Sequence, residues 1–170
     1  MFRSFFFTVV VMVGCLTVIG GKSALAQSSE GSTLSQEERI VAITILAEAR
    51  GEGSEGMYAV ACVIKQRSIE RHISVSAVCL QRFKPSRFWQ FSCWNDGATV
   101  DKLSVQVTRK TSPEVIDYAI ALAQGLVAGK DLDRSTIGFA NHYCTLETHP
   151  SWAKGKVPVI VIGHHKFYKL

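Results

Sequence analysis

Two glutamates four residues apart, Glu48 and Glu52, are the residues whose type and spacing could support acid–base chemistry. Glu48 stands in the last turn of an apolar helical segment, just before a break at Gly51 and Gly53. Apolar surroundings and the negative end of a helix dipole both favour the protonated form of a carboxyl group. A carboxyl group that stays protonated near neutral pH can donate its proton to a leaving oxygen, so Glu48 is a candidate general acid.

Glu52 is the second catalytic candidate, and its role depends on whether the helix continues past Gly51. On a continuous helix Glu52 would neighbour Glu48, and two close carboxyl groups can act as acid and nucleophile. If the glycines break the helix, Glu52 would instead pair with Arg50 or cap the following helix. The ordinary alternative for Glu48 is a solvated residue at a helix end.

A second group of candidates is aromatic or carries an amide. Residues 88–94 (FWQFSCW) are unusually aromatic for a loop, and more aromatic residues follow near the C-terminus. Sugars have apolar faces, so rings beside amide or hydroxyl groups suit a saccharide groove, although the same rings could form a lid packed on the core. The predicted substrate-binding residues are Trp89, Phe91, Trp94, Asn141, Tyr143 and Trp152.

The first 26 residues predict a secretory signal peptide. Arg3 precedes an apolar run from residue 5 to residue 19, and residues 24–26 (ALA) form a small-x-small ending. The alternatives are an uncleaved membrane anchor and, through Cys15, a lipoprotein. We expect export to the periplasm or cell envelope. Cleavage after Ala26 would lower the net charge from +5 to +3, which suits an acidic polymer without identifying it.

Four cysteines remain after such a cleavage: Cys62, Cys79, Cys93 and Cys144. An even number in an oxidising compartment allows disulfides, in three possible pairings. We favour Cys79 with Cys93 because both flank one short loop. The sequence has no C-x-x-C or H-E-x-x-H spacing, so we expect no metal and no cofactor.

These candidate residues must be positioned by helices and strands. The sequence pattern predicts an α+β domain over residues 35–170, after a flexible linker at residues 27–34. Ser35 and Glu38 have the spacing of a capping box. Residues 82–110 show no helical period. Helices are expected over residues 35–50, 54–71, 75–80 and from 113 to the stop at Gly129, and strands over 137–140 and 157–162.

Several motifs, in the same order along the chain, resemble the SleB/CwlJ-type cell-wall hydrolase family. The most distinctive is residues 47–52 (AEARGE), and the resemblance covers nearly all of residues 38–168. The sequence departs from the family in having no separate peptidoglycan-binding repeat, and in having Cys144 where a polar residue or histidine is expected. The other matching segments are 55–61 (EGMYAVA), 65–67 (KQR), 91–94 (FSCW), 140–143 (ANHY) with Trp152, and 162–168 (IGHHKFY).

The resemblance implies a compact, lysozyme-like, mainly helical catalytic domain that acts on peptidoglycan, with Glu48 as the catalytic glutamate. Some members are lytic transglycosylases that use one carboxyl group and the N-acetyl group of the substrate. We therefore predict cleavage between N-acetylmuramic acid and N-acetylglucosamine. We expect a monomer whose partner is peptidoglycan, with no nucleic-acid partner and membrane contact only through the signal segment.

Two alternatives remain open on the sequence alone. One is a zinc amidase or peptidase that cuts the stem peptide, with His142, His149 or His164 as metal ligands. The other is a non-catalytic module that binds the wall, for which Glu48 would be dispensable.

Overall fold

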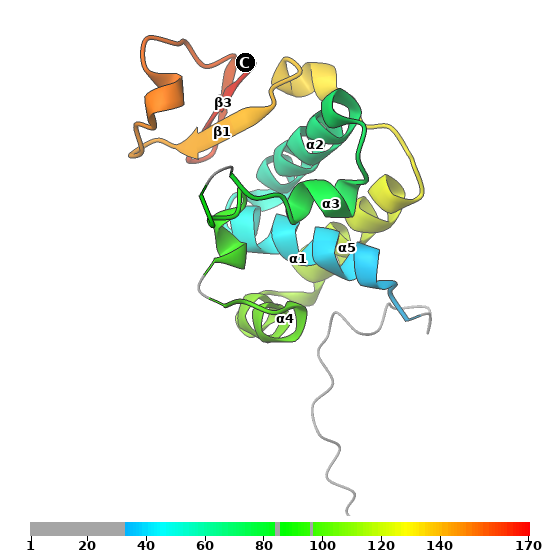
Figure 1. Cartoon of the computed structure of the whole chain (residues 1–170). Helices are drawn as coiled ribbons and strands as arrows, with labels where there is room; N and C mark the ends of the chain where they lie inside the picture. Colours follow the sequence, from blue (N-terminus) through cyan, green and yellow to red (C-terminus); the bar gives the residue numbers. More distant parts are fainter. Residues whose placement is uncertain (1–32, 84–85, 96) are drawn as a thin grey trace, which may run out of the picture.

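The computed structural model describes residues 33–170, except 84–85 and 96 (Figure 1). Five α-helices precede a small three-stranded sheet near the C-terminus, which confirms the predicted α+β class. The predicted signal peptide lies outside the described residues, as does most of the predicted linker. Within the described part of the chain, no helix has the length and apolar character needed to cross a membrane.

Over the described residues, five α-helices, three 3₁₀ turns and three strands follow one another. They are α1 (Gln36–Ala49), α2 (Gly53–Arg71), α3 (Val75–Cys79), η2 (Ser92–Trp94), α4 (Val100–Thr108), α5 (Pro113–Val127), η3 (Arg134–Ile137), β1 (His142–Thr145), η4 (Ser151–Ala153), β2 (Ile160–Ile162) and β3 (His165–Tyr168).

Helix α1 is the central element of the helical part. The predicted capping box is present: Ser35 N donates to Glu38 Oε2 at 2.7 Å, and Glu38 N donates to Ser35 Oγ at 3.2 Å. The helix is buried without interruption from Ile40 to Leu46, so it is apolar on all sides, as expected of a helix surrounded by protein. Helices α2, α3, α4 and α5 all pack against it, and Figure 1 shows them grouped around it. The end of α1 therefore has a fixed position.

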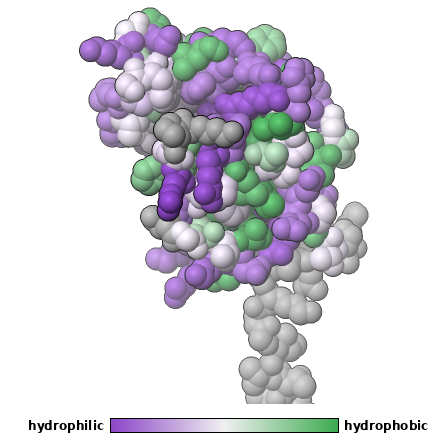
Figure 2. Space-filling model, in the orientation of Figure 1, coloured by the Kyte–Doolittle hydropathy of each residue, from purple (hydrophilic) through white to green (hydrophobic). Residues whose placement is uncertain are grey.

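The sheet has the strand order β1-β3-β2, and both pairings are antiparallel. Its inner face carries Tyr143, Phe167 and Ile162, and it packs on Ala59 and Val63 of α2. The opposite face carries alternate residues of the same strands, as the two-residue period of a strand requires. The sheet is thus attached to the helical part mainly through α2. Figure 2 shows a largely hydrophilic surface on the side seen in Figure 1, with hydrophobic residues in separate patches.

Helix α4 lies in the segment 82–110, where the sequence predicted no helix. Thr99 caps this helix by accepting from Lys102 N, and the buried residues Leu103, Ser104 and Val107 have helical spacing. A buried serine between two apolar residues obscured the period. The prediction of a helix-free segment was therefore wrong at residues 100–108.

The strand predicted at residues 137–140 is also absent. Gly138 and Phe139 have φ angles of 57° and 55°, in the left-handed region, which no strand contains. The first strand begins instead at His142, and β3 was not predicted because His165 and Lys166 give it a polar appearance. The strand predicted at 157–162 is present as the shorter β2.

The disulfide predicted between Cys79 and Cys93 is not formed, since both residues, like Cys62 and Cys144, are free thiols. Cys79 is fully buried on α3 within the helical core. Cys93 lies on η2, where its thiol interacts with Glu48. The shared loop therefore brings the two residues into one region, but one thiol belongs to the core and the other faces the carboxyl group.

Candidate active site

Glu48 stands at the C-terminal end of α1, half-buried, where the helical part meets the sheet. Its Oε2 accepts a hydrogen bond of 2.8 Å from the hydroxyl group of Tyr143, which belongs to β1. A residue on the central helix and a residue 95 positions later on the sheet are thus joined at one carboxyl group.

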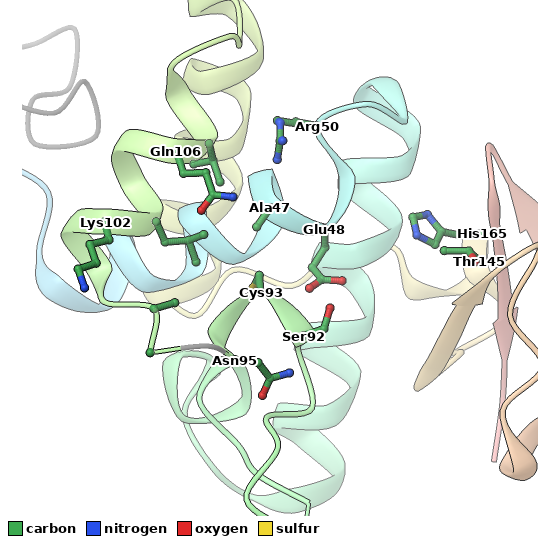
Figure 3. A pocket seen from close by; sticks show the side chains of 14 residues that line it. Ala47, Glu48, Arg50, Ser92, Cys93, Asn95, Lys102, Gln106, Thr145 and His165 are labelled. Atoms are coloured by element: carbon green, nitrogen blue, oxygen red, sulfur yellow. The ribbon is translucent and has the colours of Figure 1, made fainter.

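Two adjoining cavities meet at Glu48. We call the larger one, with a volume of about 650 Å³, the outer cleft, and the smaller one, with a volume of about 220 Å³, the inner cavity; both are open to solvent to a similar extent. Figure 3 shows the Glu48 carboxyl group between η2 on one side and the sheet residues Thr145 and His165 on the other. Both cavities are lined by Glu48, Ser92, Thr145 and His165; the outer cleft adds Arg50, Cys93, Asn95, Lys102 and Gln106, and the inner cavity adds Arg67, Gln90, Tyr143, Cys144 and Thr148.

Two neutral donors surround the Glu48 carboxyl group. Burial and then the charge of Glu48 raise the pKa of the Tyr143 hydroxyl well above its usual value of 10. The same two causes, in the same order, raise the pKa of the Cys93 thiol. Both groups therefore keep their protons at neutral pH and act toward Glu48 as hydrogen-bond donors.

Arg67 places a buried cation behind this carboxyl group. Its Nε donates to the backbone oxygen of Asn141 at 2.6 Å, and its guanidinium carbon lies 5.2 Å from the centroid of the Phe91 ring. Burial lowers its pKa to about 10, so it stays charged at neutral pH. Its side chain lines the inner cavity together with Glu48 and Tyr143.

Glu52 lies apart from the two cavities and connects the α1–α2 junction to the turn between β2 and β3. Its Oε2 accepts from the backbone N of His164 at 2.7 Å, and this bond holds the pKa of Glu52 below its usual value. Gly163 allows this close approach, because a Cβ at that position would clash with Glu52 Oε2 and the carboxylate would have to move. The helix does break after Ala49, as the glycines suggested, so the two glutamates do not stack on one helix face.

The six predicted substrate-binding residues are mostly placed elsewhere. Phe91 is 1% exposed and Trp94 is 4% exposed, and both belong to the helical core. Trp94 Nε1 donates to Thr44 Oγ1 at 3.1 Å, inside that core. The alternative of aromatic rings packed on the core is therefore correct for these two, because the loop folds inward against α1.

Three of the other four also lie outside the two cavities. Trp89 stacks against the guanidinium group of Arg82 at 4.1 Å. The Asn141 side chain is buried and donates to Glu70 Oε2 at 2.9 Å. Trp152 packs with His142 and Tyr168 on the outer face of the sheet. Of the six, Tyr143 alone lines a cavity with Glu48.

The sequence analysis missed most of the residues that surround Glu48. The missed residues are small or polar: Ser92 and Asn95 from the turn η2, Thr145 and His165 from two neighbouring strands. Arg67 stood in a matching motif without an assigned role. Pairing of Thr145 with His165 across β1 and β3 places both side chains on the inner face, and that register was not readable from the sequence.

The histidines predicted as possible zinc ligands do not form a metal site. Within residues 33–170, leaving aside 84–85 and 96, no group of three or more His, Cys, Asp or Glu side chains has an arrangement that could hold a metal ion. His142 stacks on Trp152, and His164 contacts Glu52.

Fold and site together define a small α+β domain with a cleft centred on one helix-end carboxyl group. A family model described as Cell Wall Hydrolase matches residues 51–168, and the chain belongs to this family, which is of the SleB/CwlJ type that the motifs resembled. The match begins three residues after Glu48. No curated protein and no solved structure matches the chain.

Proposed function

We propose that this hydrolase of the peptidoglycan wall cuts the glycan strand between N-acetylmuramic acid and N-acetylglucosamine, with Glu48 as general acid. One observation carries the proposal. Among the described residues that line the two cavities, Glu48 is the single carboxylic acid, and it stands where the cavities meet. A glycosidase that works with one carboxyl group needs that group to reach the bridging oxygen and needs the substrate to supply the second function.

Protonation of the bridging oxygen is the step assigned to Glu48. As the bond to the anomeric carbon breaks, the carbonyl group of the muramyl N-acetyl group stabilises the positive charge at that carbon. Tyr143 contributes by donating to the carboxylate that Glu48 becomes after it loses its proton. If the C6 hydroxyl of the sugar then attacks, a 1,6-anhydro product forms, and if water attacks, a reducing end forms.

The site of action that fits this chemistry is the cell envelope, where the substrate is found. The predicted signal peptide supports export, and the family acts on the wall. The mild positive charge expected after signal cleavage suits an acidic polymer.

Mass spectrometry of peptidoglycan digested by residues 27–170 tests the proposal, with Glu48→Gln as the variant. We expect cut glycan strands with the parent chain and a loss of rate of about 10²- to 10⁴-fold in Glu48→Gln, the usual contribution of a general acid. Glu52→Gln is the matched control, four residues away and outside both cavities, and it should keep its activity wherever it stays folded.

The product identifies the mechanism. Anhydro-muropeptides would establish a lytic transglycosylase, and reducing ends would establish hydrolysis. Intact glycan with cut stem peptides would overturn the proposal in favour of an amidase or peptidase. Equal activity of Glu48→Gln and parent would remove Glu48 as the acid, and a folded parent that binds the wall without cutting it would favour a binding module.

A further inference from the structure

The inner cavity is bordered by two buried side chains whose hydrogen-bonding capacity is incomplete. Arg67 Nη1 and His165 Nδ1 are buried and have no hydrogen-bond partner within the protein. The two residues are 6% and 7% exposed, and both line the inner cavity beside Glu48. The other unpartnered buried nitrogens of the described residues belong to Arg39 and Arg134, which are ion-paired with carboxylates away from this cavity.

Unpartnered buried polar atoms of residues that line a cavity are candidates for contact with a ligand. Leaving a buried donor unpaired costs about 1–3 kcal/mol, and native proteins rarely accept that cost without a role for the group. A guanidinium group only donates, so its partner must carry an acceptor oxygen. Glu48 already contributes a carboxyl group to the same cavity, and a second anion beside it would be repelled. A neutral carbonyl oxygen meets these requirements.

Peptidoglycan offers such oxygens next to the bond that the proposed function assigns to Glu48. The muramyl N-acetyl group is needed at the anomeric carbon, so it is not free to enter the inner cavity. Two neutral amide carbonyls remain near the bond: the lactyl amide that joins muramic acid to its stem peptide, and the acetamido group of the N-acetylglucosamine on the other side of the bond.

We propose that the inner cavity is an amide-binding subsite in which Arg67 Nη1 donates a hydrogen bond to a substrate amide carbonyl. His165 Nδ1 supplies a second polar contact, as donor or acceptor according to its tautomer. Arg67 is held for this role by Asn141 and Phe91, which fix its Nε and its plane without occupying Nη1. The inference rests on the proposed function for the identity of the substrate, but the subsite itself selects amide-bearing sugars whether or not they are cut.

Binding measurements on the Glu48→Gln chain test the subsite without cleavage. The probes are muramyl dipeptide, which carries the lactyl amide, N-acetylchitotriose, which carries acetamido groups, and cellotriose, which has hydroxyl groups in their place. We expect at least one amide probe to bind more tightly than cellotriose. Adding Arg67→Lys, which keeps the charge and removes Nη1, should weaken that binding about tenfold or more, as the loss of a charge-assisted hydrogen bond does.

Two further variants keep the test decisive. His165→Phe keeps a ring against Tyr143 and Phe167 while it removes Nδ1, and it replaces Arg67→Lys if melting curves show that the latter is unfolded. Arg134→Lys is the matched control, because Arg134 also has an unpartnered buried Nε but lines neither cavity. It should bind every probe as the Glu48→Gln chain does.

Each result has one meaning. A loss confined to muramyl dipeptide assigns the subsite to the lactyl amide, and a loss with N-acetylchitotriose assigns it to the acetamido group. Equal affinity of folded Arg67→Lys and its parent for both amide probes overturns the proposal, as does cellotriose binding as tightly as the amide probes, or no binding of either amide probe. These binding outcomes are independent of whether glycan cleavage is found, so the two proposals can fail separately.

Discussion

The helical part and the C-terminal sheet contribute to the site in opposite ways. The helical part owes its form to apolar burial around α1 and supplies Glu48, the residue proposed as general acid. The sheet has strands of three or four residues and a small apolar cluster, yet it supplies Tyr143, Thr145 and His165 around that group. Glu48 and the polar groups around it thus come from separate parts of the chain, so the geometry at Glu48 depends on how the sheet is attached to the helices.

Several polar attachments join the two parts besides the apolar contact with α2. Among them, the Tyr143 hydroxyl donates to Glu48, the backbone N of His164 donates to Glu52, and Lys169 Nζ donates to Glu70 at 2.7 Å. The following predictions break these attachments, or the helical core itself, in order of decreasing effect.

Gly163→Ala should have the largest effect, because it disrupts the turn that binds Glu52. The new Cβ would displace the Glu52 carboxylate, and Gly163 has φ 55°, which is unfavourable for alanine. We expect a loss of about 3 kcal/mol in the free energy of unfolding, combining backbone strain with a lost charged hydrogen bond. Urea denaturation measures it.

Gly155→Ala is the control for that experiment. Gly155 has φ 72°, but a Cβ there meets nothing within 4 Å, so strain alone remains and the loss should be about 1 kcal/mol. Equal losses in the two variants would show that the Glu52 attachment contributes nothing.

Trp94→Phe tests the helical part and should come next. It removes the hydrogen bond from Trp94 Nε1 to Thr44 and part of a side chain that is 4% exposed, so we expect a loss of about 2 kcal/mol. Thermal unfolding followed by circular dichroism gives the change. A variant as stable as the parent would contradict the view that this residue is core rather than groove.

Tyr143→Phe should reduce activity more than stability. The phenylalanine keeps the ring contacts with His165 and Phe167 but no longer donates to Glu48. We expect kcat on solubilised peptidoglycan to fall about tenfold, which corresponds to about 1.4 kcal/mol of barrier. An unchanged rate in a folded variant would mean that Tyr143 only packs the sheet against α1.

Glu70 should give the smallest effect, visible as a pH dependence of stability. Burial raises its pKa, but hydrogen bonds from Lys169, Gln66 and Asn141 outweigh this and lower it to about 2. Because the folded pKa lies below the unfolded value of about 4.5, the stabilisation is present above pH 4.5 and is lost as the pH falls toward 2.

Comparing Glu70→Gln with the parent chain measures that contribution. The parent should be more stable by about 1 kcal/mol at pH 6, since the group is partly exposed, and the difference should shrink as the pH is lowered from 4.5. A difference that does not change with pH would show that the carboxylate charge is not what attaches the C-terminal strand.

Local signals in the sequence predicted the helical part well. The capping box of Ser35 and Glu38, the glycines after Ala49 and the proline at the start of α5 act within one turn of chain, so they are readable without the fold. Helix α4 was not predicted because a serine occupies one of its buried positions. The strands of the sheet were only partly predicted, because their register depends on contacts with α2 that no local pattern encodes.

Of the residues around the two cavities, the sequence singled out Glu48 and Tyr143 and missed most of the others. The end of its helix and the motif at residues 47–52 both pointed to Glu48. Most of the aromatic residues expected beside it lie instead in the core or on the far face of the sheet. The sequence placed Phe91 and Trp94 in one short segment with Ser92 and Cys93, which line the outer cleft, but it did not show which way the two rings face. Arg67 and His165 become visible as candidates only when burial and unpaired nitrogen atoms are known.

The order of the strands has a further consequence for solubility. Strand β2 forms one edge of the sheet, and the side chains of Val157, Val159 and Val161 along this edge are 85%, 48% and 51% exposed. Exposed edges rich in valine are templates for pairing between copies of a chain. The three-residue length of β2 and the charges of Lys154 and Lys156 just before it oppose such pairing. We therefore expect replacement of these two lysines by uncharged residues to increase aggregation of the chain.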